Sequence, residues 1–198
     1  KRRTSSRRSA SGAGASFSAA CFCAMKRSIS LRAQGPLTGG GVTFATGMHA
    51  DRAHFDRLLV LLAKATGEEE RWTLASALAA GRDAQRAEEL LAESLKGLAP
   101  TNVSSAIPAM VAGLSPFGDL AYRYALDNWK ALAELAGNRD RVFLLPGAAR
   151  GFTTPEQADS LVEDQRRNAG VDGDTLAARA AEAIRLRAAV SAREAPGL

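Results

Sequence analysis

The residues best suited to catalysis are few and scattered along the chain. His49 and His54 are its two histidines, five positions apart with no glutamate between them. A zinc hydrolase of the H-E-x-x-H type needs histidines four positions apart on one helical face, together with a carboxylate base. That motif is absent, and we interpret both histidines as solvent-exposed residues at the start of a helix.

Other reactive residues are equally isolated. Ser94 and Ser160 have no histidine near them in the sequence, although one could still lie close in space. The acidic run Glu68–Glu70 favours the first turn of a helix over a metal site, because the helix dipole stabilises acids there. The run Gly39–Gly41 is not followed by the lysine of a phosphate-binding loop. We therefore expect no catalysis within this chain alone.

Charge divides the chain at about residue 50. Eight of the 26 Lys and Arg residues and none of the 21 acids lie in residues 1–50, which leaves 18 bases against 21 acids, a net charge of −3, in residues 51–198. A nucleic-acid-binding domain would be expected to concentrate positive charge. We therefore expect no nucleic-acid partner for the domain; binding through the basic tail is a separate, weaker hypothesis.

Residues 1–50 are rich in Ser, Gly, Ala and Arg and show no sustained helical or strand period. We interpret them as a disordered, basic, low-complexity extension. The alternative is an organelle transit peptide, because such peptides are rich in Arg and Ser and poor in acids. Cys21 and Cys23 also lie here, and the rest of the chain is free of cysteine, as expected in a reducing compartment. We expect a cytoplasmic protein, or an organellar one if residues 1–50 are a transit peptide.

Residues 51–198 predict helix after helix. Apolar residues recur at helical spacing between Gly, Pro and capping residues such as Asp83 and Thr154. The expected helices span 54–65, 68–81, 83–98, 103–112, 117–135, a short one in 139–150, 154–168 and 174–193. Because short loops make consecutive helices antiparallel, we predict an all-α fold, an irregular solenoid or bowl of about eight helices in hairpins, similar to HEAT or armadillo repeats. No run of apolar residues is long enough to span a membrane.

The aromatic residues of the domain favour packing over chemistry. Trp72, Tyr122, Tyr124 and Trp129 fall on or beside the apolar faces of the expected helices. We interpret them as residues that pack between helices. The alternative is that some line a concave ligand surface.

Several short sequence motifs, called phrases below, resemble one protein family. They occur in the same order as in that family over about 140 residues, from His54 to Glu194. The phrases are Phe55-Asp56-Arg57-Leu58-Leu59, Glu69-Glu70-Arg71 followed by Leu74 and Ala77-Leu78, Asn128-Trp129 preceded by Ala121-Tyr122 and Tyr124, Phe152-Thr153-Thr154 with Gln157, and Glu182-x-Ile184. The set resembles the C-terminal helical domain of zinc aminopeptidases of the aminopeptidase N type, called the endoplasmic-reticulum-aminopeptidase-like C-terminal domain. Asn128 and Trp129 form its most recognisable motif.

Two departures concern the last hairpin. The family usually has an aromatic pair before the turn near Gly170, where this chain has Gln165-Arg166-Arg167-Asn168. The family also tends to carry an aromatic residue in its final helix, where this chain has only small apolar residues. Residues 1–50 do not resemble the family.

The resemblance implies a bowl of helical hairpins that caps a separate catalytic domain, encloses the peptide chamber and contacts the distal part of the peptide. Zinc is implied in that domain and not in this chain. The catalytic domain in cis and a peptide substrate are the implied partners, with Arg71 and Arg123 as candidate cavity contacts. The first residue is Lys, so we expect a fragment. The alternative is a stand-alone helical-repeat scaffold that binds a protein or peptide.

Overall fold

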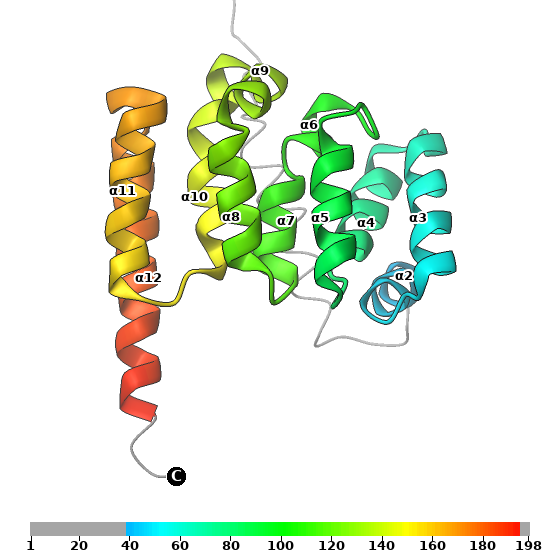
Figure 1. The fold of residues 1–198 in the computed structure, drawn as a ribbon, viewed down its shortest axis with the longest axis horizontal. Coiled ribbons are helices and arrows are strands. Elements are labelled where there is room, and N and C mark those ends of the chain that lie inside the picture. The colour runs from blue at the N-terminus through cyan, green and yellow to red at the C-terminus, as the bar shows by residue number, and fades with distance from the viewer. Residues whose placement is uncertain (1–38, 195–198) are drawn as a thin grey trace, which may run out of the picture. The chain divides into compact units, whose positions relative to one another are not determined.

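The computed structural model describes residues 39–194, which form α-helices and short 3-10 helices, with no strand in that range. The α-helices are α2 (Gly39–Met48), α3 (Arg52–Lys64), α4 (Glu68–Ala79), α5 (Ala84–Ser94), α6 (Thr101–Ser104), α7 (Ile107–Leu114), α8 (Gly118–Asp127), α9 (Trp129–Asp140), α10 (Leu144–Ala148), α11 (Pro155–Ala169) and α12 (Asp174–Glu194). The 3-10 helices are η1 (Arg141–Phe143), η2 (Ala149–Gly151) and η3 (Gly170–Gly173). The predicted all-α fold is confirmed (Figure 1).

Helix α2 corrects the interpretation of residues 1–50, where no helix was expected. It contains Gly39–Gly41, a run of residues with low helix propensity, and it packs against α4. A Cβ atom on Gly47 would lie 2.0 Å from the carbonyl oxygen of Ala77, so the absence of a side chain lets the two backbones meet. Tertiary packing thus outweighs the low helix propensity of glycine. The disorder or transit-peptide role predicted for the rest of that segment lies outside the described residues.

Helices α3, α4 and α5 form the first part of the packed core. Local caps set their starts: the Asp51 carboxylate accepts the His54 amide at 2.9 Å, and the Asp83 carboxylate accepts the Arg86 amide at 3.0 Å. The acids Glu68–Glu70 occupy the first turn of α4, as predicted. Phe55, Leu58 and Leu62 bury one face of α3.

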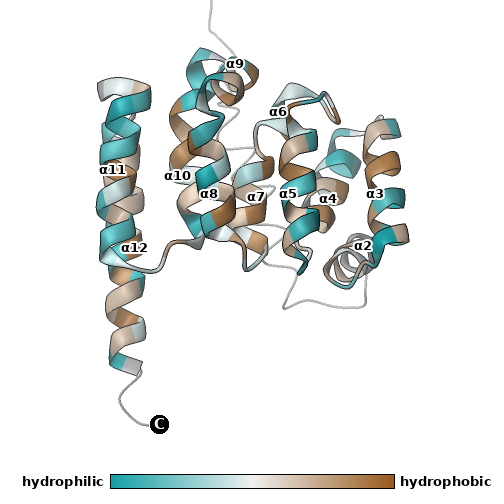
Figure 2. Cartoon of the chain, viewed as in Figure 1, coloured by the Kyte–Doolittle hydropathy of each residue, from teal (hydrophilic) through white to brown (hydrophobic). Residues whose placement is uncertain are grey.

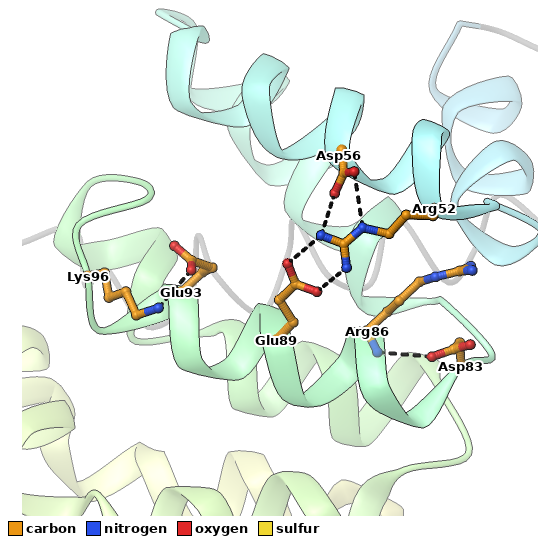
Figure 3. A network of polar contacts seen from close by, with 7 residues as sticks. All are labelled: Arg52, Asp56, Asp83, Arg86, Glu89, Glu93 and Lys96. Carbon is orange, nitrogen blue, oxygen red and sulfur yellow. Dashed lines mark hydrogen bonds and ion pairs between the residues drawn. The ribbon is translucent and has the colours of Figure 1, made fainter.

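A network of ion pairs joins α3 to α5 (Figure 3). The Arg52 guanidinium donates to both carboxylate oxygens of Glu89, at 2.6 and 3.0 Å, and to Asp56 at 3.0 Å. These bonds raise the pKa of Arg52, with the bond to Glu89 the largest cause. Near the end of α5, Glu93 pairs at 2.9 Å with Lys96, which lies in the turn after the helix. Arg52 and Lys96 are exposed, and Asp56, Glu89 and Glu93 are only partly buried. Because solvent screens such pairs, the network orients the helices more than it stabilises them.

Two predicted helices are each interrupted. The helix expected at 103–112 is divided into α6 and α7, and Pro108 stands in the first turn of α7, where its missing amide hydrogen does no harm. The helix expected at 117–135 is divided at Asn128, whose side-chain amide donates to the Tyr124 carbonyl at 3.0 Å. Its backbone leaves the helical region there, with φ −106° and ψ 21°. Side-chain bonding of this kind competes with a continuous helix.

Two glycines let α8 approach η2. A Cβ atom on Gly118 would lie 2.7 Å from the Cα of Gly151, and one on Gly151 would lie 2.6 Å from the Cα of Gly118. Around this contact α7, α8 and α10 pack together. Neither glycine has a positive φ, so close packing alone requires them.

Helices α11 and α12 form the final hairpin (Figure 1). The Thr154–Gln157 capping box is present as predicted: the Gln157 amide donates to the Thr154 hydroxyl at 3.3 Å, and the Thr154 amide donates to the Gln157 carbonyl oxygen at 3.1 Å. Gln165, at the departure from the family pattern, is fully buried. Its amide nitrogen donates to the Val142 carbonyl at 3.1 Å, so a hydrogen bond holds α11 to η1.

Candidate functional site

An open hollow of about 450 Å³ lies between α8 and α11. Its lining comes from Asp119, Tyr122 and Arg123 of α8, from Phe152, and from Glu156, Gln157 and Ser160 of α11. The two helices are 42 residues apart at the Tyr122–Asp164 hydrogen bond, so only the tertiary fold creates this surface.

Two aromatic rings form the floor of the hollow. The ring centroids of Tyr122 and Phe152 are 4.5 Å apart and tilted by 51°, an arrangement that aromatic pairs favour. Both residues are only 5% exposed. The Tyr122 hydroxyl donates to the Asp164 carboxylate at 3.0 Å, so this bond to α11 fixes the orientation of the ring.

Burial raises the pKa of Tyr122 well above its usual value, and the charge of Asp164 and the hydrogen bond to it add to the shift. The folded state thus favours the protonated phenol. The protonated Tyr122 phenol therefore contributes to the free energy of unfolding. This contribution is complete below the unfolded pKa of about 10 and is lost as the pH rises above that value, because the unfolded chain then releases the proton.

We expect the free energy of unfolding to fall as the pH rises from 9 to 11, by up to about 1.4 kcal/mol per pH unit for Tyr122. The Tyr122→Phe variant should show a flatter decline. The measurement is urea unfolding followed by tryptophan fluorescence at each pH. Tyr124→Phe is the matched control and should flatten the decline less: burial also raises the Tyr124 pKa, but there the Ser94 hydroxyl and the charge of Lys96 act in the opposite direction. An equal decline in Tyr122→Phe and the wild type would contradict the assignment.

The rim of the hollow is organised by Gln157. Its carbonyl oxygen accepts the amides of Thr153 and Thr154, at 2.9 and 3.1 Å, while its amide nitrogen donates to the Asp119 carboxylate at 2.8 Å. One side chain therefore caps α11 and joins it to α8. Next to it, backbone bonding at the helix start and the Thr154 hydroxyl lower the pKa of Glu156, so this carboxylate is charged at neutral pH.

Arg123 supplies positive charge beside these two carboxylates. It is exposed, and it makes no ion pair or hydrogen bond with any residue in 39–194. A guanidinium that lines the same hollow as two aromatic rings is suited to hold a carboxylate or a carbonyl group of a bound chain. The hollow thus offers groups for binding, and its role as a peptide contact stays a prediction.

Arg71 lies elsewhere and has an evident structural task. Its Nε donates to the Ala65 carbonyl at 2.8 Å, which ties the start of α4 to the end of α3. The structure therefore does not bring the two candidate arginines to one hollow. The role of Arg71 as a cavity contact stays a prediction, whereas its bond to the Ala65 carbonyl is present in the structure.

Asn128 and Trp129, the recognisable motif, occupy the junction between α8 and α9. Trp129 is 8% exposed and packs in a core cluster with Tyr122 and Leu132. Its interpretation as a packing residue agrees with this position.

The serine candidates are bonded to their own helices. The Ser94 hydroxyl is buried and donates to the Leu91 carbonyl at 2.6 Å, and the Ser160 hydroxyl donates to the Glu156 carbonyl at 3.1 Å. His49 and His54 are exposed, as predicted, but only His54 lies at the start of a helix, since His49 directly follows the end of α2.

Sequence reasoning identified Arg123 and Gln157 but did not place them together, and it passed over Asp119 and Phe152 as lining residues. The sequence did indicate that two of the lining residues on α8 lie together. Asp119 and Arg123 are four positions apart and so lie on one helical face. Nothing in the sequence indicated that α11 lies opposite them.

No protein-family model matches this chain, and a search of curated proteins finds no match to its sequence. Within residues 39–194 no group of three or more His, Cys, Asp or Glu is placed to hold a metal ion. In the same part of the chain no helix has the length and apolar character to cross a membrane.

Proposed function

We propose that this chain is the non-catalytic C-terminal helical domain of a zinc metallo-aminopeptidase. In this role it caps a separate catalytic domain, which carries the zinc, and encloses the chamber that receives the peptide. The observation that carries the proposal is the ordered set of family phrases between His54 and Glu194.

The positions of these phrases in the fold support the proposal. Glu69-Glu70-Arg71 starts α4, Asn128-Trp129 joins α8 to α9, and Thr154 with Gln157 starts α11. Residues at helix starts and junctions set where one helix ends and the next begins. An ordered series of them is therefore a stronger sign of a common fold than apolar spacing alone.

The hollow between α8 and α11 is consistent with contact to the distal part of a peptide. Arg123 can pair with a carboxylate, while Asp119 and Glu156 can receive peptide amides or basic side chains. Enclosure by a helical cap would hold the peptide in place and exclude water from the reaction, while zinc in the catalytic domain activates the attacking water.

A stand-alone scaffold that binds a protein or peptide is the second candidate. The unpaired Arg123 in an open hollow favours it, because such a surface can bind a partner without any enzyme. The two candidates differ in the partner that they require. In either case a domain without cysteine, residues 51–198, suits a reducing compartment such as the cytoplasm.

The test combines the purified chain with the catalytic domain of an aminopeptidase N-type enzyme from which the helical domain has been removed. We expect the chain alone to hydrolyse no amino-acid amide, with or without added zinc. We expect the mixture to regain hydrolysis of long peptides, while its hydrolysis of single amino-acid amides stays unchanged. Arg123→Ala should weaken the gain on long peptides at least about threefold through KM, because it removes one charged contact.

Chelator-sensitive turnover by the chain alone would show that it is itself an enzyme and would contradict the proposal. Failure to bind the catalytic domain would favour the scaffold. Lys130→Ala, which removes an exposed cation on α9 away from the lining of the hollow, is the matched control for Arg123→Ala.

A further inference from the structure

The outward face of α3 carries a stripe of exposed residues at helical spacing. They are Ala53, Arg57, Val60, Leu61 and Lys64, here called the α3 stripe. At 3.6 residues per turn all five fall within an arc of about 100°. Val60 is 51% exposed and Leu61 is 45% exposed, although the opposite side of the helix is buried in the core.

Exposed apolar residues of this size are concentrated at the two ends of the helical array. Among the described residues, four of the five large apolar side chains that are exposed lie on α3 and α12: Val60, Leu61, Leu186 and Val190. Figure 2 shows hydrophobic residues along both helices. In a stack of helices the terminal unit normally presents a polar outer face. The α3 stripe does not, which indicates that another element covers it.

The charge of the stripe indicates the nature of that element. Arg57 and Lys64 lie about one turn before and after the apolar pair, and neither forms an ion pair or hydrogen bond with a described residue. The nearby carboxylate of Asp56 is already paired with Arg52 at 2.9 Å (Figure 3). Two free cations therefore bracket an apolar centre, and the complementary surface has an apolar seam flanked by acids.

We propose that the α3 stripe binds an amphipathic helix with acidic flanks that belongs to the catalytic domain in cis. This inference rests on the proposed function, because the polypeptide link supplies the tether. A second copy of the chain is a poor occupant, since two α3 stripes would place cations against cations in either orientation. The stripe is only about 16 Å long. Such a contact buries less than the roughly 1,200 Å² of a stable free complex and needs the high effective concentration of a tether.

Two synthetic helical peptides test the inference in the full chain. They share one leucine seam and differ only in its flanks, which carry Glu in one peptide and Lys in the other. Each is titrated into ¹⁵N-labelled protein, and amide shifts are followed by NMR. Because the free peptides lack the tether, the titration is carried to about millimolar concentration, where weak binding still shifts amides. We expect the Glu peptide to shift the amides of α3 at a concentration at least about tenfold lower than the Lys peptide, and its binding to weaken as salt increases.

Charge reversal provides the matched variants. The double variant Arg57→Glu/Lys64→Glu should prefer the Lys peptide, with its fold verified by circular dichroism. Arg179→Glu/Arg193→Glu on α12 should keep the wild-type preference. That face already carries the exposed acid Glu182, so it discriminates less between the two peptides.

Equal binding of the two peptides, or amide shifts away from α3, would overturn the inference. So would self-association of the chain that Val60→Ser/Leu61→Ser abolishes. None of these measurements involves turnover, so the result is independent of the enzymatic test. A catalytic domain that binds the wild type and the charge-reversed variant equally well would reject this contact and leave the proposed function intact.

Discussion

Replacing Trp129 with alanine is expected to lower the free energy of unfolding by about 3–5 kcal/mol, the usual cost of removing a buried large aromatic side chain. The indole is 8% exposed and lies in the core cluster that also contains Tyr122, Leu132 and Leu145. Because Trp129 is the first residue of α9, the cavity would open at the junction of α8 and α9. Urea unfolding followed by circular dichroism measures the loss.

Two neighbouring substitutions show whether packing is the cause. Trp129→Phe keeps an aromatic ring in the cluster and should cost less. Asn128→Ala removes the bond to the Tyr124 carbonyl but no core volume, and should cost about 1 kcal/mol. If Asn128→Ala were as damaging as Trp129→Ala, the junction would depend on its hydrogen bond and the packing argument would fail.

Replacing Gly118 with alanine is expected to cost about 2–3 kcal/mol, although alanine is the better helix former. The new methyl carbon would lie 2.7 Å from the Cα of Gly151. Because the obstructing atom belongs to the backbone, no rotation of a side chain can relieve the clash, and α8 must move away from η2. The hollow should then change too, since Tyr122 and Arg123 follow on the same helix.

Gly67→Ala is the control for the effect of a methyl group alone. Its nearest neighbour would be the Cβ of Glu70 at 3.7 Å, an ordinary contact, and the cost at this N-cap position should be no more than about 1 kcal/mol. Thermal unfolding of the two variants gives the comparison. A Gly118→Ala protein as stable as Gly67→Ala would show that the approach of α8 to η2 is not close in solution.

Local chemistry in the sequence predicted most of the fold. Asp83 starts α5, and Thr154 with Gln157 starts α11, because a cap needs only residues three positions apart. The apolar spacing predicted these helices, and the short loops between them predicted the α3–α4 and α11–α12 pairs. These features depend on near neighbours and can be identified from one sequence.

The rest depends on contacts between distant residues. Helix α2 exists through its packing on α4, and the sequence around Gly39–Gly41 by itself favours a break. The end of α8 depends on whether the Asn128 amide turns back to Tyr124, a choice that apolar spacing does not reveal. The hollow was the least predictable feature, since α8 and α11 supply complementary halves of it.

Position 157 shows how two requirements can select one amino acid. Glutamate and glutamine serve equally well at the third position of a capping box. Only glutamine also presents an N–H group to the Asp119 carboxylate, whereas glutamate would place two like charges 2.8 Å apart. Gln157→Glu is neutral by the capping rules of α11, but the Asp119 carboxylate of α8 would repel the new charge. The Asp119 carboxylate on α8 thus restricts which amino acid can stand in the first turn of α11. The two helices therefore constrain each other's sequence as well as each other's position.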